Sequence, residues 1–315
     1  MTNQLVLTKP AATVRLGSKK LVEIKRAQDV IEGLAWASVV AVTVMFLLDG
    51  GAANFKDVPT TLNAISRLSS LIGTDLLLIH MLLVARVPWI DKFYGHDRAT
   101  LAHKKLGKPV LYFIVAHFLA SLISFAITEG KNVIATWWWL ITDVPDMLTA
   151  TIGLLLMVLV VVTSLNFARR KMSYEAWFLV HLLSYASVLV AVPHIFSTGS
   201  DIAGKPVQTI FWVTLYLFVA GNIIWYRVLK PLVAALAMKT RVSSVVRESS
   251  DTVSISISGR NLSKLGAQSG QFFVLRVMTP TQWWRAHPFS ISATPTDSTI
   301  RFTIGNRGDD TALLQ

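Results

Sequence analysis

The sequence contains no cysteine, and acidic residues are scarce: 18 Asp and Glu stand against 30 Lys and Arg among 315 residues. Without cysteine, the chain holds no disulfides, thiolate metal sites or iron–sulfur clusters. Charged residues make up only 15% of the chain and hydrophobic residues 53%, with a mean hydropathy of +0.53. That composition is typical of an integral membrane protein rather than a soluble one.

Six apolar segments have the length needed to cross a bilayer. They are 31–50, 64–86, 103–128, 147–167, 174–197 and 208–229. Basic residues gather in the N-terminal arm, after the second and fourth segments and after the sixth, whereas the other three loops hold only Lys56, Lys131 and Lys205. The positive-inside rule therefore predicts a multi-pass protein of the plasma (cytoplasmic) membrane with both termini in the cytoplasm. Since topology accounts for the net charge of +12, that charge indicates no nucleic-acid partner.

The composition changes near residue 238. From there, alternating stretches such as DTVSISIS, QFFVLRV and TIRFTIG predict β-strands. We therefore expect a cytoplasmic N-terminal arm over 1–30, an all-α six-helix bundle in the membrane over 31–232, and a β domain over 238–315.

Two of the six segments carry two histidines each. His103 and His117 lie fourteen residues apart on the third, and His181 and His194 lie thirteen apart on the fifth. These two segments run in the same direction, so the histidines form two levels about 20 Å apart. A single histidine in a membrane helix is more often a packed polar residue, but four at matching depths suit axial ligation of two haem irons. Thirteen residues turn about 1300°, which points His194 off the face of His181 unless Pro193 kinks the helix.

Several motifs together carry a resemblance to a known family. The stretch HKKLGKPVLYFIVAH (103–117), with His181 and His194, resembles the ferric reductase and NADPH oxidase superfamily. In that family a six-helix haem core precedes a cytoplasmic flavin and nicotinamide dehydrogenase. HPFSIS (287–292) resembles its FAD-binding signature, HPF followed by Ser or Thr, and GQFF (270–273) resembles the strand before it. RGDDT (307–311) resembles the turn that opens a helix on the FAD pyrophosphate, where backbone N–H groups bind phosphate.

The resemblance implies a transmembrane oxidoreductase. It would pass electrons from NAD(P)H through FAD and two haem b groups to an external acceptor, which is a ferric chelate, copper or oxygen. The implied iron ligands are His103, His181, His117 and His194. Arg67 is implied to contact a propionate of the outer haem. No side chain is expected to act as a general base, because the redox chemistry belongs to the cofactors.

The resemblance also assigns roles in the flavin site. Phe289 would lie against the isoalloxazine ring, Ser290 near its N5 edge, and His287 with Pro288 would shape the bend. The other implied FAD-binding residues are Ile291, Ser292, Gly308, Asp309 and Thr311.

The sequence departs from the family pattern in two places. The chain stops just after the pyrophosphate turn, so we expect an incomplete antiparallel β-barrel of the ferredoxin-reductase type and no nicotinamide-binding domain. NAD(P)H would then act through a missing domain or a separate reductase. Ser121 stands where oxygen-reducing relatives often carry a further histidine, which weakens the case for oxygen as acceptor.

Two alternative functions remain open. One is a haem b membrane subunit that exchanges electrons with quinone, against which HPFSIS and RGDDT argue. The other is a proton channel or transporter that uses the histidines and Asp75, since a carboxylate in a membrane is costly without a partner. An absorption spectrum distinguishes a channel, which is colourless, from a haem protein. His80 could contact the inner haem, but we favour a hydrogen bond to a neighbour.

Overall fold

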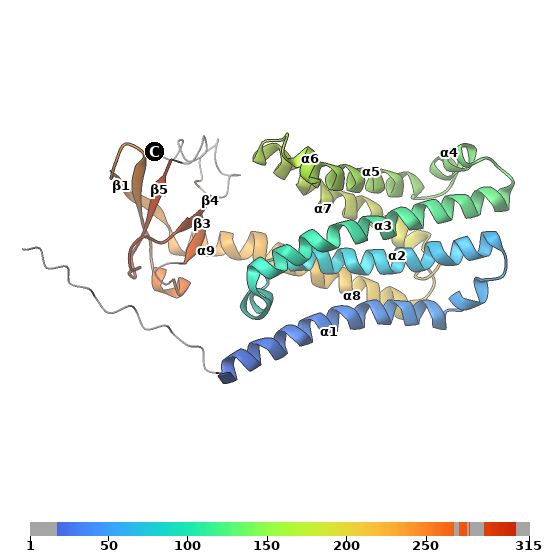
Figure 1. Ribbon diagram of the computed structural model, residues 1–315, viewed down its shortest axis with the longest axis horizontal. Coiled ribbons are helices and arrows are strands. Elements are labelled where there is room, and N and C mark those ends of the chain that lie inside the picture. Colours follow the sequence, from blue (N-terminus) through green and yellow to red (C-terminus); the bar gives the residue numbers. More distant parts are fainter. Residues whose placement is uncertain (1–17, 268–270, 276, 278–286, 307–315) are drawn as a thin grey trace, which may run out of the picture. The chain divides into compact units, whose positions relative to one another are not determined.

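The computed structural model describes residues 18–267, 271–275, 277 and 287–306, except for the side chains of 18–20 and 274. It divides into two compact units, Met1–Ile223 and Ile224–Gln315. The first unit is helical, and the second holds the strands (Figure 1). The boundary precedes the composition change at residue 238, so the end of the last apolar segment belongs to the second unit.

The first unit is built from long apolar helices. They are α1 (Ser18–Leu48), α2 (Val58–Leu83), α3 (His96–Glu129), α4 (Val133–Asp143), α5 (Met147–Ser164), α6 (Asn166–Arg169), α7 (Tyr174–Ser197) and α8 (Pro206–Ile223). By length and composition, six segments can cross a membrane: Leu21–Leu48, Val58–Leu83, Ile90–Glu129, Met147–Ser164, Tyr174–Ser197 and Pro206–Met238. The prediction of six spanning helices is thus confirmed, although α1 begins at Ser18, within the predicted arm.

Polar residues set where several helices begin. Asp57 precedes α2, and its carboxylate accepts hydrogen bonds from the Thr60 hydroxyl at 2.6 Å and the Thr60 backbone N–H at 2.9 Å. These bonds hold the pKa of the Asp57 carboxyl below its ordinary value, so this cap weakens as the pH falls through the lowered pKa. Ser173 caps α7 in the same way, by accepting from the Ala176 N–H at 3.2 Å.

The helices that carry the histidines are held close to their neighbours by small residues. α2 packs along α3, and α5 packs along α7. A Cβ on Gly73 would lie 3.0 Å from the Phe113 Cβ of α3, and one on Gly153 would lie 3.0 Å from the Ser187 carbonyl of α7. Small residues at such contacts let helix backbones approach in a membrane, where association depends on packing. The Ser187 hydroxyl also donates to the Gly153 carbonyl at 2.7 Å.

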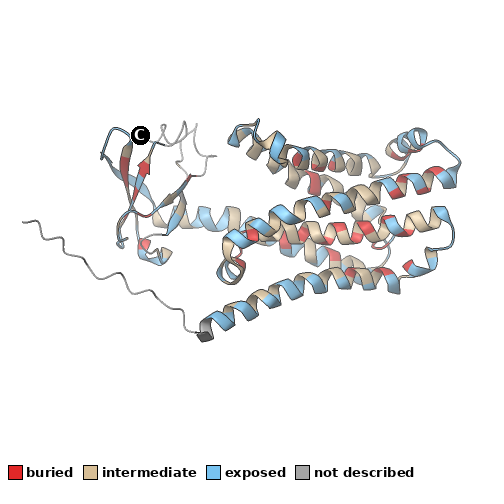
Figure 2. Ribbon diagram, in the orientation of Figure 1, coloured by how far each residue is buried: buried red, intermediate tan, exposed pale blue. Residues whose placement is uncertain are grey.

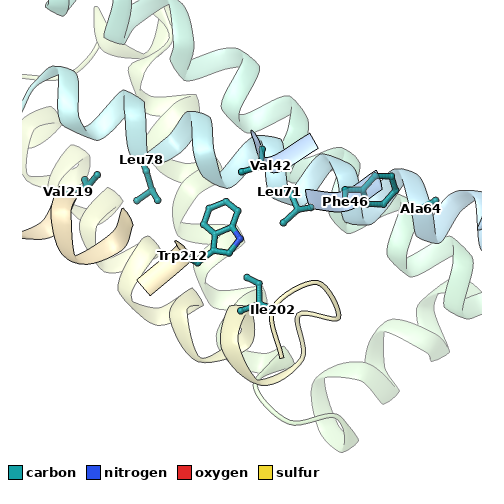
Figure 3. Close-up of a cluster of buried hydrophobic side chains, with 8 residues drawn as sticks. All are labelled: Val42, Phe46, Ala64, Leu71, Leu78, Ile202, Trp212 and Val219. Carbon is teal, nitrogen blue, oxygen red and sulfur yellow. The ribbon is translucent and has the colours of Figure 1, made fainter. Parts of the chain in front are cut away.

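The largest buried cluster of the helical unit joins α1, α2, α8 and the loop before α8. Its members are Val42, Phe46, Ala64, Leu71, Leu78, Ile202, Trp212 and Val219, with Trp212 in the middle of the set (Figure 3). Many large apolar side chains on the outside of the unit are exposed, and α1 is exposed along much of its length (Figure 2). Exposed apolar surfaces of this kind fit lipid contact.

The second unit contains the short helix α9 (Lys230–Met238) and five described strands. These are β1 (Arg241–Arg247), β2 (Thr252–Ser258), β3 (Phe272–Leu275), β4 (His287–Ser290) and β5 (Thr299–Gly305). One sheet has the order β1-β2-β5, the other pairs β3 with β4, and all pairs are antiparallel. A bridge between Ile291 and Phe302 links the two sheets. The predicted antiparallel domain is confirmed, while the strands within the described ranges do not close a barrel.

Candidate functional site

The structure brings the four histidines of α3 and α7 together as two pairs. The ring centres of His103 and His181 lie 6.1 Å apart, with 70° between the ring planes. Those of His117 and His194 lie 6.3 Å apart, with 50° between the planes. The spacing along the sequence left open which way His194 points. In the structure its ring faces that of His117, and α7 continues as a helix through Pro193.

The separation within each pair matches what one metal ion between two imidazoles requires. A ligating ring nitrogen lies about 2 Å from a transition metal and about 1.1 Å from its own ring centre. Two rings on opposite sides of one ion therefore have centres about 6 Å apart. Both pairs meet this condition, so both fit the two axial positions of a haem iron.

The hydrogen bonds of the outer pair leave the Nε2 atoms as the available ligands. His117 Nδ1 lies 3.1 Å from the Ser66 carbonyl, which can only accept, so Nδ1 carries the proton. His194 Nδ1 lies 2.7 Å from the Thr198 hydroxyl, whose own hydrogen is donated to the His194 carbonyl at 2.8 Å. Each ring therefore donates through Nδ1 and keeps a free lone pair on Nε2, which is the common arrangement of metal-binding histidines.

The inner pair follows the same rule. His103 Nδ1 donates to the His80 carbonyl at 3.0 Å. His181 Nδ1 lies 3.3 Å from the Ser164 hydroxyl, which donates its own hydrogen to the Val160 carbonyl at 2.7 Å. The Ser164 oxygen is thus an acceptor for His181. Nδ1 of each of the four histidines thus has a hydrogen-bond partner, which is the arrangement typical of metal-binding histidines.

The outer pair opens into a cavity of about 340 Å³ between α2, α3, α4, α5, α7 and α8. This volume falls in the range of about 300–1,000 Å³ that is typical of small-molecule sites. Mostly apolar side chains line it, and its wall also includes His117, His194, Arg67, Ser121 and Trp137. A largely apolar pocket with two facing imidazoles and a cation at its edge fits a haem with its propionates.

A cluster of charges lies at one edge of this cavity. Arg67 donates through Nε to Asp201 at 2.9 Å, makes a second bond to Asp201 through Nη2, and lies 3.3 Å from Asp49. Lys205 also pairs with Asp49. Arg67 therefore lines the cavity, as the resemblance implied, but its guanidinium is already engaged by two carboxylates. Asp49, Asp201 and Lys205 were not singled out from the sequence, where only their places at the ends of apolar segments could have indicated them.

The remaining polar residues of the helical unit do not assemble a metal site of their own. Within the part of the chain that the structure describes, no group of three or more His, Cys, Asp or Glu side chains could hold an ion. A haem needs only two protein ligands, because the porphyrin supplies four nitrogens. Asp75 is fully buried, and its Oδ1 accepts from the Ser38 hydroxyl at 2.6 Å.

The flavin motif lies on β4 and the residues after it, and its side chains alternate. His287 and Ile291 are buried and Phe289 is half-buried, whereas Pro288, Ser290 and Ser292 are exposed. Phe289 pairs across the strands with Phe273 and packs against the buried cluster of the sheets.

The exposed face of β4 is therefore the one that carries Ser290, which we call the serine face of β4. Phe289 lies on the opposite face and packs within the domain. Gly308, Asp309 and Thr311, which the resemblance assigns to the pyrophosphate, lie outside the described residues.

Comparisons with known proteins match both parts of the chain. A family described as ferric reductase like transmembrane component matches residues 69–192, which include His103, His117 and His181, while His194 lies just beyond the match. A family described as FAD-binding domain matches residues 237–315, which include HPFSIS and RGDDT. No curated protein matches the chain. The two matches coincide with the apolar helices and with the antiparallel strands, and by them the chain belongs to the ferric reductase and NADPH oxidase superfamily and is a membrane oxidoreductase with an FAD-binding domain.

Proposed function

We propose that this protein carries electrons across the membrane, from NAD(P)H through FAD and two haem b groups to an acceptor on the far side. The observation that supports this most directly is the state of the four histidines: two facing pairs, each with ring centres about 6 Å apart, with every Nδ1 engaged. Bound FAD and haem would supply the conversion of a hydride into single electrons.

The chain's own residues would hold and insulate these cofactors. His103 with His181, and His117 with His194, would offer Nε2 lone pairs from both sides of each iron. If these four histidines hold both haems, an external acceptor would take its electron by outer-sphere contact near the outer cavity, without binding iron. Ferric chelates and copper suit such a contact. Oxygen does too, although Ser121 in that wall offers no imidazole to assist it.

The haem content of the unmutated protein tests the proposal. We expect two haem b per chain in a pyridine haemochrome assay, and a reduced b-type spectrum after dithionite is added. A proton channel would be colourless. Either one haem or none per chain would contradict the assignment of two histidine levels.

A second test concerns the flavin face of β4. Ser290→Ala should weaken FAD binding by about two- to tenfold, because a hydrogen bond contributes roughly 0.5–1.5 kcal/mol, while an exposed serine adds little to folding. Phe289→Ala should also weaken FAD binding, and it should destabilise the sheet in addition because it removes the contact with Phe273. FAD fluorescence gives the affinities, and thermal unfolding gives the stabilities.

The matched control is Ser244→Ala, which removes an exposed hydroxyl from β1. This variant should bind FAD as the unmutated protein does. Equal FAD affinity in Ser290→Ala and Ser244→Ala would show that the flavin does not use the serine face of β4.

A further inference from the structure

Two aromatic rings cover the inner histidines. The His80 ring, on α2, stacks on the His103 ring with centres 3.7 Å apart and only 10° between the planes. The Trp177 ring, on α7, stacks on the His181 ring at 4.9 Å and 27°. Both members of the inner pair are therefore flanked by a flat ring.

Each covering residue also takes part in the hydrogen bond that fixes its histidine. The carbonyl of His80 accepts from His103 Nδ1 at 3.0 Å. The indole N–H of Trp177 donates to the Ser164 hydroxyl at 3.2 Å, and this is the hydroxyl that accepts from His181 Nδ1. Stacking limits the rotation of each imidazole, and the hydrogen bond selects its tautomer.

The covering rings are themselves held in place. The Arg169 guanidinium lies 4.8 Å from the centre of the Trp177 ring and 5.8 Å from that of Tyr174, within reach of cation–π attraction. On the other side, His80 Nε2 lies close to α3, where a Cβ on Gly107 would come within 3.5 Å of it. The Trp177 ring therefore cannot swing away without losing its contact with Arg169, and the lack of a side chain at Gly107 leaves room for the His80 ring.

The outer pair is built differently. His117 and His194 are fixed by the Ser66 carbonyl and the Thr198 hydroxyl, and they face the cavity. Among the residues that the structure describes, no aromatic ring stacks on either of them; they meet only each other, with 50° between their planes.

We infer that His80 and Trp177 are positioning residues of the inner site: they fix the planes of His103 and His181, and so set the properties of the inner haem separately from those of the outer one. This inference rests on the proposed function, because it takes the inner pair to be haem ligands. The simpler alternative is that the two rings only fill space between helices.

Electron paramagnetic resonance of the ferric protein at low temperature distinguishes these explanations, because the low-spin haem signal depends on the angle between the two imidazole planes. The whole chain is compared as unmutated protein and as His80→Leu, Trp177→Leu, His80→Phe and Trp177→Phe. Midpoint potentials from spectroelectrochemical titration and haem content by pyridine haemochrome accompany each spectrum. The His117→Ala variant, which should keep only the inner haem, identifies the inner signal.

The leucine variants should shift or broaden the inner signal and move the inner midpoint potential, while the outer signal stays unchanged. The phenylalanine variants keep a flat ring, so they should retain most of the original signal. Phe178→Leu is the matched control: it removes a ring from the residue next to Trp177 that stacks on Tyr174 rather than on a histidine, and both signals should remain. Loss of the inner haem in a leucine variant, with retention in the phenylalanine variant, also supports the inference.

Three results would overturn the inference. They are an unchanged inner signal in both leucine variants, an equal change at the outer level, and phenylalanine variants that differ from the unmutated protein as much as the leucine variants do. If the unmutated protein shows no low-spin haem signal at all, the proposed function itself is wrong, and the inference is rejected along with it.

Discussion

Replacing His117 or His194 by alanine should remove one of the two haems from the purified protein and leave the other in place. In the proposed function each of these residues would supply one of the two protein nitrogens that hold the outer haem, and their ring centres lie 6.3 Å apart. The inner level uses His103 and His181, on preceding turns of the same helices, with hydrogen-bond partners of its own. The pyridine haemochrome assay should therefore fall from two haems per chain to one.

The same variants should abolish electron delivery to an external acceptor, because the outer haem would be the last carrier before the acceptor. Dithionite should still reduce the inner haem and give half of the original b-type band. His96→Ala is the matched control: His96 lies at the start of α3, 3.4 Å from Asp91, and belongs to neither pair. If His96→Ala lost a haem, or if His117→Ala kept both, the assignment of the ligands would have to be abandoned.

Replacing Arg67 by methionine should destabilise the helical unit by about 2–3 kcal/mol. The Arg67 and Asp201 side chains are only 15% and 10% exposed, so loss of the cation leaves the Asp201 carboxylate without its charge partner, while Asp49 keeps Lys205. Breaking a buried pair typically costs 3–5 kcal/mol and an exposed pair 0–1 kcal/mol, which places this partly buried cluster at about 2–3 kcal/mol. Thermal or denaturant unfolding in detergent micelles measures the effect.

A double-mutant cycle isolates the ion pair. Arg67→Met together with Asp201→Asn should be less destabilised than Arg67→Met alone, because the second change removes the uncompensated charge. Glu129→Gln is the control, since Glu129 and Lys131 form an exposed pair at 3.9 Å, and its stability should hardly change. If Arg67→Met instead lost the outer haem at unchanged stability, contact with a haem propionate would be the main role of Arg67.

The six membrane-spanning helices and the strand content could be predicted from the sequence because their signals are local. An apolar run of about 20 residues is long enough to span a bilayer whatever surrounds it. Alternation in TVSISIS and TIRFTIG likewise indicates strands, and the structure pairs these two as β2 and β5. Burial alternates along β5, whereas in β2 Ser254 is buried together with Val253 and Ile255.

Helix boundaries were less predictable. α1 begins at Ser18 rather than near residue 31, because the polar stretch before the apolar run contains no Pro or Gly that would end the helix.

The direction of His194 shows the limit of reasoning from spacing. An ideal helix turns about 100° per residue, and thirteen residues leave His194 well off the face of His181. The two histidines do not need to share a face, however, because each faces a different partner on α3: His181 meets His103, and His194 meets His117. The relation between α3 and α7 decides the outcome, and spacing along one helix cannot supply it.

The sequence by itself determined that this is a six-span membrane protein with a β domain after it, that two spans carry paired histidines, and that its motifs belong to an FAD-dependent oxidoreductase family. Only the tertiary structure decided which groups engage Nδ1 of His103 and His117, because both acceptors come from α2. It also decided that His80 and Trp177 cover the inner pair and that Arg67 pairs with Asp201, 134 residues away. Local patterns report the period and length of an element, whereas contacts between elements depend on how the whole bundle packs.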